Sequence, residues 1–507
     1  MFHITSSATI GISSVPVTVE TDISLGLKTF CVVGLPDASV KESRDRIRAA
    51  IKNSGFKFPR GKITVNLAPA DVRKQGPIYD LPIALSILVA MGEIPRSSIE
   101  TSVFIGELAL DGSVRPVQVA LIAGIMAKKI SKCDLFVPVL NTAEAAAVNG
   151  LNVYGVASLK TVVDHLTQTK ILEKAERKKR ACVKRHDHDF SEIKGQEAAK
   201  RGLEIAAAGS HNILLKGPPG AGKTLLARSL PSILPSLTYE EAVEATAIAS
   251  IAGVLGSQQG LMETRPFRSP HHSSSAVSLV GGGTWPKPGE VSLAHCGVLF
   301  LDELPEFSRF TLEHLRQPIE DGSVTISRAV GSVQFPARFL LVAAMNPCPC
   351  GHLTNPHRPC TCSHEAVMRY QKKISGPLLD RFDIVIEVPA VEYEKLLSQE
   401  KPESSEAIRG RVESARAAQR KRLKGMKLFL NNEISSAQLD VCAPLTQQTR
   451  ALLEQALRGN HLSARGYTRV RKVARTIADL DESEEITVDH MAEALQYRGQ
   501  DNIQAYG

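Results

Sequence analysis

One eight-residue segment near the middle of the chain constrains the fold more than any other. Residues Gly217 to Thr224 read Gly-Pro-Pro-Gly-Ala-Gly-Lys-Thr, which is the G-x-x-x-x-G-K-[ST] pattern of a phosphate-binding P-loop. The apolar run Asn212 to Leu215 predicts a buried strand before it, and Leu225 to Leu230 predicts a helix after it. This is the context that the motif requires, because backbone N–H groups and the helix N-terminus then surround the phosphates.

The P-loop and a second motif, which ends in two acidic residues, predict which residues bind ATP. We expect Lys223 to reach the β- and γ-phosphates and Thr224 to ligate Mg²⁺. Val298 to Leu301 predicts another buried strand, which ends in Asp302 and Glu303. Asp302 is expected to hold Mg²⁺ and Glu303 to act as general base. The loop residues expected to surround the phosphates are Gly217, Pro218, Pro219, Gly220, Ala221 and Gly222.

Composition narrows the class of protein. The chain has 507 residues, enough for about three domains, and its net charge of +8 permits nucleic-acid binding without requiring it. The first residues lack the basic and apolar pattern of a signal peptide, and apolar runs such as Ile83 to Met91 are too short to span a bilayer. Five scattered cysteines fit a reducing compartment. We therefore expect a soluble, cytoplasmic protein without a membrane partner.

Residues 1–165 alternate strand-like runs with helical segments and predict an α/β domain. Strands are expected at Val15 to Glu20, where apolar residues alternate, and at the apolar runs Thr29 to Val33 and Lys62 to Leu67. Leu81 to Met91 is apolar on every side and predicts a buried helix.

This domain resembles the Lon protease domain, which has the S5 domain 2-like fold. The resemblance is carried by Gly76 to Ala84, Ile105 to Leu108 and Val114 to Val117. It implies a catalytic Ser straight after the Gly-Pro and a catalytic Lys shortly after the Pro-Val. Ile78 and Leu121 occupy these positions here. A Ser–Lys dyad needs a hydroxyl and an amine, so we expect a Lon-like domain without peptidase activity.

The remaining chain divides into a linker, a nucleotide-binding core and a helical region. Residues 166–189 are rich in Lys and Arg and predict a solvated linker, with a nucleic-acid contact as the alternative. Phe190 to Gln196 resembles the segment that packs near adenine in AAA+ ATPases, which implies that Ile193 and Gly195 contact the base. We expect a P-loop AAA+ α/β core over 190–390 and a C-terminal helical lid over 391–507.

Further residues match polar positions of the AAA+ fold. Asn346 ends an expected core strand and matches sensor 1, whose amide helps to orient the attacking water. Leu378 to Asp383 resembles the L-L-x-R-F-D segment of the MCM-like and Mg-chelatase-like clade. That resemblance implies that Arg381 is an arginine finger for the neighbouring subunit, with Arg369 as the second choice. Arg465 begins a helix and matches sensor 2.

Two segments carry residues that suit contact with DNA. Residues 265–290 are rich in Gly and Pro and are interpreted as a pore loop, with an ordinary surface loop as the alternative. Arg268 and Lys287 suit phosphates, and Trp285 suits stacking on a base. Residues 322–336 predict a β-hairpin that resembles the hairpin before sensor 1 in the same clade, which implies a DNA contact for Arg328 near its tip.

Four cysteines form two C-x-C pairs in an insert at 348–362. Four thiolates at this density suit tetrahedral Zn²⁺, although C-x-C is tighter than the usual spacing. His352, His357 or His364 could replace one ligand. A structural zinc is favoured, and reduced thiols or a redox disulfide are the alternatives. The cysteines are Cys348, Cys350, Cys360 and Cys362.

The order of these regions resembles the ComM/YifB family over nearly the whole chain. Members of that family are described as magnesium-chelatase-like. The resemblance to the ComM branch implies a hexameric, ATP-driven DNA helicase that promotes branch migration in natural transformation and homologous recombination. A protein-remodelling AAA+ ATPase and a Mg-chelatase-like motor subunit for metal insertion are the alternative functions.

Overall fold

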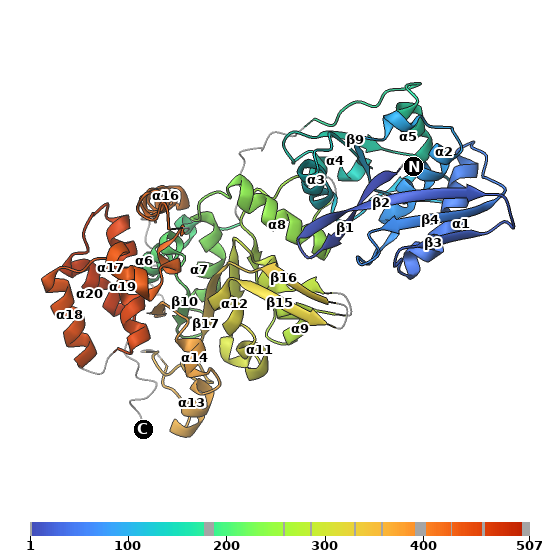
Figure 1. Ribbon diagram of the computed structural model, residues 1–507. Helices are drawn as coiled ribbons and strands as arrows, with labels where there is room; N and C mark the ends of the chain where they lie inside the picture. Colours follow the sequence, from blue (N-terminus) through green and yellow to red (C-terminus); the bar gives the residue numbers. More distant parts are fainter. Residues whose placement is uncertain are drawn as a thin grey trace. The chain divides into compact units, whose positions relative to one another are not determined.

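The chain forms two compact units (Figure 1). The computed structural model describes residues 3–176, 187–256, 259–283, 286–328, 331–355, 358–390, 402–426, 428–458 and 462–498. Unit 1 comprises Met1–Cys182, Tyr239–Met262 and Gly331–Phe335, and unit 2 comprises Val183–Thr238, Glu263–Val330 and Pro336–Gly507. Within the described ranges, no helix is both long and apolar enough to cross a membrane.

Unit 1 is built on a seven-stranded mixed sheet with the order β3-β4-β2-β1-β5-β8-β9. Strand β2 pairs antiparallel with β1 and β4, and the other neighbours are parallel. Alternate residues of β4 are buried, as expected for a strand with one covered face. The strands are β1 (Ile4–Ile10), β2 (Ser13–Ser24), β3 (Phe30–Val33), β4 (Lys62–Ala68), β5 (Ser102–Phe104), β8 (Asp134–Pro138) and β9 (Asn152–Val156).

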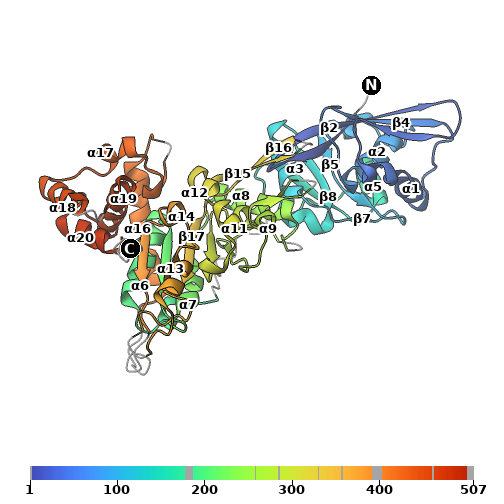
Figure 2. The same cartoon turned by 90° about the horizontal axis from the view of Figure 1, so that it is seen from below.

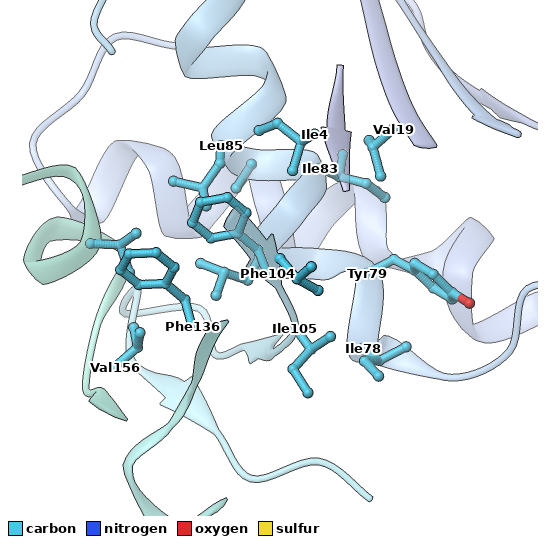
Figure 3. Close-up of a cluster of buried hydrophobic side chains, with 14 of the residues drawn as sticks. Ile4, Val19, Ile78, Tyr79, Ile83, Leu85, Phe104, Ile105, Phe136 and Val156 are labelled. Atoms are coloured by element: carbon cyan, nitrogen blue, oxygen red, sulfur yellow. The ribbon is translucent and has the colours of Figure 1, made fainter. Parts of the chain in front are cut away.

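The core of unit 1 lies between this sheet and its helices. Helix α2 is buried from Asp80 to Val89, which confirms the predicted buried helix. Figure 3 shows the aromatic part of the core, where the Phe104 and Phe136 rings stack with centroids 4.8 Å apart. The other elements are α1 (Ala38–Asn53), η1 (Pro77–Tyr79), α2 (Asp80–Ala90), β6 (Glu107–Leu108), β7 (Val114–Arg115), α3 (Ala120–Lys129), α4 (Thr142–Ala145) and α5 (Leu159–Leu166).

Helix α8 (Tyr239–Ala252) follows the P-loop segment in sequence and yet packs in unit 1. Its Ser250 Oγ accepts the backbone N–H of Val119 at 2.9 Å and donates to Glu144 Oε1 at 2.6 Å. Ala247 of α8 joins a small apolar cluster with Leu121 and its neighbours. The contact is therefore both apolar and hydrogen-bonded, and it fixes α8 against α3 and α4.

Unit 2 contains a five-stranded sheet with the order β11-β14-β17-β10-β18, and every neighbouring pair is parallel. The central strands are continuous apolar runs, as parallel strands covered on both faces require. This sheet confirms the predicted α/β class. Its strands are β11 (Phe267–Arg268), β14 (Val298–Leu301), β17 (Leu340–Met345), β10 (Ile213–Lys216) and β18 (Ile384–Glu387).

Helices and one short strand pair accompany the sheet of unit 2, and a hairpin has its first strand in unit 2 and its second strand in unit 1. The predicted hairpin at 322–336 is present as β15 (Ser323–Arg328) and β16 (Gly331–Pro336). A second pair consists of β12 (Gly281–Gly282) and β13 (Lys287–Pro288). The helices before residue 391 are α6 (Glu197–Gly209), α7 (Lys223–Ser229), α9 (Ala276–Val280), α10 (Glu290–Leu293), α11 (Arg309–Glu313), α12 (Arg316–Asp321), α13 (His364–Gln371) and α14 (Gly376–Leu379).

The C-terminal helices pack on α6 and share the core of unit 2 (Figure 2). The buried carboxylate of Asp479 accepts hydrogen bonds from Arg422 at 2.6 Å, Asn431 at 2.8 Å and Arg475 at 3.1 Å. These donors come from three separate segments, so one carboxylate ties them together. The helices are α16 (Ser405–Arg422), α17 (Leu439–Cys442), α18 (Gln447–Arg458), α19 (Ala464–Leu480) and α20 (Val488–Gln496).

Candidate nucleotide-binding site

The P-loop connects β10 to α7, as the sequence predicts. Its glycines are needed for shape: Gly220 and Gly222 have φ of 77° and 87°, a region that favours glycine. A Cβ at Gly217 would clash with the carbonyl oxygen of Val388 in the segment after β18. The backbone N–H of Gly217 donates to the carbonyl of Met345 at 3.2 Å. The loop is therefore fixed between two parallel strands of the sheet.

Lys223 lies inside the loop and contacts the residue expected as sensor 1. Its Nζ donates to the carbonyl oxygens of Gly217 at 2.6 Å and Pro218 at 2.8 Å, and to Asn346 Oδ1 at 3.1 Å. Burial lowers the pKa of Lys223, and the negative charge of Asp302 opposes this effect. The lysine and the asparagine, which are 123 residues apart in sequence, therefore belong to one site.

The hydroxyl of Thr224 meets the acidic pair at the end of β14. Thr224 Oγ1 donates to Asp302 Oδ2 at 2.8 Å. A hydroxyl and a carboxylate side by side form the kind of oxygen donor set that Mg²⁺ prefers. These two residues therefore fit the role of metal ligands, and bound Mg²⁺ would supply positive charge to the phosphates.

Glu303 has a left-handed backbone with φ of 51°, which is uncommon outside glycine. Its carboxylate lies 3.5 Å from His272 Nδ1. The His272 ring also contacts the rings of His271, at 4.1 Å between centroids, and Phe307, at 6.5 Å. Both histidines lie in the segment 265–290 that was interpreted as a pore loop. The sequence does not predict this contact, because His272 is 31 residues from Glu303 and no local pattern connects them.

The segment before α6 also contacts the P-loop. The predicted adenine contacts are Ile193, which is buried, and Gly195, which has φ of 66°. The amide of Gln196 donates to the carbonyls of Ala221 at 3.3 Å and Pro389 at 2.6 Å. Ile193 and Gly195 are thereby placed beside the P-loop by the residue that follows them.

Arg381 follows the C-terminal end of α14, and Arg465, at the start of α19, approaches the same place. The Arg381 side chain is only 5% exposed, and its guanidinium donates to the Pro377 carbonyl at 2.6 Å and pairs with Glu320. Arg465 is 62% exposed and lies 3.7 Å from Asp380. Arg369, the second choice for the finger, lines an open groove of about 760 Å³.

The predicted DNA contacts differ from one another in their surroundings. Arg268 donates to both carboxylate oxygens of Glu290, at 2.6 and 2.7 Å, and this hydrogen bonding raises its pKa. Lys287 is exposed on β13. Trp285 and the side chain of Arg328 lie outside the described residues. Arg268 is therefore held in an internal ion pair, which its sequence did not reveal.

The four cysteines of the insert come together. The distances between Sγ atoms are 3.4 Å for Cys348 and Cys350, 3.6 Å for Cys348 and Cys360, and 3.5 Å for Cys350 and Cys360. A tetrahedron of Zn–S bonds of about 2.3 Å separates sulfurs by about 3.8 Å, whereas a disulfide brings them to about 2.05 Å. Cys362 completes the group, and among the described residues no histidine belongs to it. His357 lies outside that part of the chain.

Backbone donors around the cluster favour thiolates. The N–H groups of Cys350 and Cys362 donate to Cys362 Sγ and Cys360 Sγ, each at 3.4 Å. Backbone N–H groups of His352 and Thr361 lower the pKa of the Cys350 thiol to about 5, whereas burial and hydrogen bonds with neighbouring thiols raise the pKa of the other three cysteines. The donor set therefore fits a four-coordinate Zn²⁺ without an open position, which is the structural kind of site.

The positions that correspond to the Lon dyad are apolar and covered. Ile78 is 8% exposed and Leu121 is fully buried. Figure 3 shows Ile78 among the core side chains, and its carbonyl accepts the N–H of Gly106 at 3.0 Å. The backbone N–H of Leu121 donates to Glu144 Oε1 at 3.1 Å, the same oxygen that accepts from Ser250 of α8.

Comparisons with known proteins match nearly the whole chain. A family model described as magnesium chelatase, subunit ChlI, matches residues 189–396, and related models match 19–141 (subunit ChlI of Mg-chelatase) and 402–498 (subunit ChlI C-terminal). Over 148 residues, 28% of this chain and 26% of its own length, Lon protease 2 of Bacillus subtilis is 29% identical.

Two relatives align along almost their full length. The uncharacterized protein YifB of Escherichia coli is 45% identical over 497 residues, covering 98% of this chain and 96% of that protein. The competence protein ComM of Haemophilus influenzae is 45% identical over 500 residues, covering 97% and 96%. With this identity, this coverage and the P-loop geometry described above, the chain belongs to the ComM/YifB family of magnesium-chelatase-like AAA+ ATPases.

Proposed function

We propose that this protein is an ATP-driven DNA motor of the helicase or branch-migration type, which works as a hexameric ring in the cytoplasm. The observation that carries the proposal is the single site in which Lys223 contacts Asn346 and Thr224 contacts Asp302. The relative from Haemophilus influenzae is named competence protein ComM, which supports a role in competence.

In the proposed reaction, Lys223 binds the β- and γ-phosphates of ATP. Its ammonium is held now by the carbonyls of Gly217 and Pro218, so the phosphates would compete with these acceptors for its protons. Thr224 and Asp302 would hold Mg²⁺. The N–H groups of the loop and of the start of α7 would bind phosphate oxygens, since they lie at a helix N-terminus.

Glu303 is the proposed general base. It would accept a proton from the attacking water, and Asn346 would orient that water through its side-chain amide. His272, whose Nδ1 lies 3.5 Å from the Glu303 carboxylate, is proposed to position that carboxylate. Hydrolysis by these groups yields ADP and inorganic phosphate.

Ring assembly would complete the site. Arg381 is proposed to act on the ATP of the neighbouring subunit, and Arg465 on the γ-phosphate in its own subunit. To do so, Arg381 must exchange Glu320 for a phosphate. Assembly and hydrolysis would then be coupled, because the same arginine takes part in both.

Among the proposed DNA contacts, exposed Lys287 is the best supported. Trp285 and Arg328 remain proposals from the sequence alone, and Arg268 would first have to leave Glu290. Zn²⁺ on the four cysteines is the proposed structural metal.

The ATPase rate with and without single-stranded or branched DNA tests the proposal, with Lys223→Ala as the blank and Lys129→Ala, an exposed lysine of α3, as the matched control. Strong stimulation that falls as salt rises is expected, because phosphate contacts release counterions. Lys287→Ala should reduce the slope of log affinity against log salt by about one. ATP hydrolysis that no DNA stimulates would overturn the DNA-motor assignment.

One alternative is supported by a specific observation. The three matching family models all describe a magnesium-chelatase subunit, which favours a motor for metal insertion. That function needs a porphyrin-binding partner subunit. Stimulation of the ATPase by a porphyrin-loaded partner, and by no DNA, would select it, whereas stimulation by unfolded protein alone would select a protein-remodelling ATPase.

A further inference from the structure

The cysteine insert begins two residues after Asn346, the residue that contacts Lys223. Strand β17 ends at Met345, and the chain continues through Asn346 and Pro347 to Cys348. Two residues therefore separate the cluster from the strand end, and one of them is the proposed sensor. Only Pro347 lies between Asn346 and Cys348, the first cysteine of the cluster.

The turn of the insert also packs on the P-loop. Gly351 has φ of 80°, and its backbone lies so close to Pro219 that a Cβ would reach within 2.6 Å of Pro219 Cγ. The same Cβ would lie 3.7 Å from Cγ of Asn346. The turn between Cys348 and Gly351, closed by a hydrogen bond of 3.0 Å from Gly351 N–H to the Cys348 carbonyl, is thus one wall of the phosphate loop.

The chain that leaves the cluster returns to the same place. After Cys362 it enters α13, where the Tyr370 hydroxyl accepts the backbone N–H of Asn346. The side chain of Gln371 donates to the carbonyl of Pro347 at 3.0 Å. Asn346 and Pro347 are therefore held by both ends of a loop that the four thiolates close.

We propose that metal bound by the four cysteines positions Pro219 of the P-loop and Asn346, so that nucleotide affinity depends on occupancy of this second metal site. The inference rests on the proposed ATP site and adds a regulatory input to it. Bound metal would hold the two C-x-C arms together and so keep the turn at Gly351 in place against Pro219. Without metal, only the connecting loop and the weak contacts between thiols would hold the arms together.

The test uses the full-length protein and fluorescent mant-ADP in excess Mg²⁺, without DNA. Zinc is removed with a thiol reagent and a chelator that binds Mg²⁺ weakly, the thiols are restored by reduction, and released zinc is measured by absorbance. We expect metal loss to weaken mant-ADP binding by about tenfold, within the range typical of coupling between two binding sites. One equivalent of Zn²⁺ per chain should restore it, and Co²⁺ in its place should give the absorption bands of a tetrahedral thiolate site.

A substitution that leaves the cysteines intact separates positioning from folding. Gly351→Ala should keep its zinc and still bind mant-ADP about tenfold more weakly, because the added Cβ displaces Pro219. Gly425→Ala is the matched control: Gly425 also has positive φ, of 93°, but a Cβ there would meet nothing within 4 Å. Its zinc content and affinity should match those of the wild type.

The outcomes distinguish this inference from the proposed function. If wild type binds mant-ADP and Lys223→Ala does not, the ATP site stands. In that case, unchanged affinity after zinc release, or in Gly351→Ala, overturns the coupling. A protein that takes up neither Zn²⁺ nor Co²⁺ overturns the metal site. If the zinc-loaded wild type does not bind mant-ADP, the proposed ATP site is refuted, and the coupling that rests on it is refuted with it.

Discussion

The contact between His272 and Glu303 allows the proposed general base to be tested separately from the residue proposed to position it. Glu303→Gln keeps the size of the side chain and removes its ability to accept a proton. A general base contributes about 10²- to 10⁴-fold to rate, so kcat for ATP should fall by about that factor. Binding of ATP should persist, because Lys223, Thr224 and Asp302 are unchanged.

The effect of His272→Ala should be much smaller. Its Nδ1 lies 3.5 Å from the Glu303 carboxylate, at the long limit of a hydrogen bond, and the two side chains are 37% and 59% exposed. An exposed pair of this kind contributes about 0.2–1 kcal/mol. Since 1.36 kcal/mol corresponds to tenfold in rate, kcat should fall by at most about fivefold, with KM unchanged.

Steady-state phosphate release by the two single variants and the double variant measures both effects. In the Glu303→Gln background, His272→Ala should change nothing further, because its only proposed action is on the missing carboxylate. His314→Ala, a histidine that contacts the ring of Phe310, serves as control. A loss of 100-fold or more in His272→Ala, with activity retained in Glu303→Gln, would refute the reasoning and make the histidine the base.

Three further predictions concern stability and assembly. Ser250→Ala removes a donor to buried Glu144 and leaves the Val119 N–H without its acceptor, so urea unfolding should show a loss of about 2–4 kcal/mol; exposed Ser97→Ala should show under about 0.5 kcal/mol. Burial raises the pKa of Asp80 to about 6 from 3.8, so the folded state binds this proton more tightly than the unfolded state. Its contribution to stability is complete below pH 3.8 and is lost as pH rises through 6; relative to Asp80→Asn, wild type should lose roughly 3 kcal/mol across that window in unfolding experiments. Arg381→Ala should abolish most ATPase activity while single chains still bind mant-ADP, and mixing it with Glu303→Gln protein should restore turnover at shared interfaces; no restoration would argue against a role in trans.

The parts of the site that the sequence predicted are those written in contiguous motifs. The P-loop needs a strand, a tight turn and a helix in succession, and these follow one another along the chain. The strand Val298 to Leu301 is followed directly by its two acidic residues, so this motif too is recognisable from one short segment. Asn346 could be placed because an apolar run that stops at a polar residue marks a strand end. Local spacing was sufficient in each case because the chemistry depends on neighbours along the chain.

Contacts between segments that are distant in sequence could not be predicted in this way. The pairing of Arg268 with Glu290 and the approach of His272 to Glu303 depend on where separate segments of unit 2 meet, which charge and composition do not encode. The burial of α8 in unit 1 is a similar case, since an apolar helix face does not specify the surface that covers it. The close packing of Gly351 on Pro219 likewise appears only when both loops are built.

The position of α8 also determines how this protein can be divided. Unit 1 is assembled from three stretches of chain, and the second of them lies between the P-loop and Asp302. Deleting residues 1–182 would therefore remove the residues that α8 packs against, while α8 itself would remain in the truncated chain. Ala247, which is 3% exposed in the intact protein and packs in a cluster with Leu121 and Ile122, would face water, and exposed apolar patches promote aggregation. Precipitation or loss of activity in a truncated protein could then result from the exposed helix α8 alone. To learn the role of the N-terminal region by deletion, the apolar surface residues of α8 must first be replaced by polar ones.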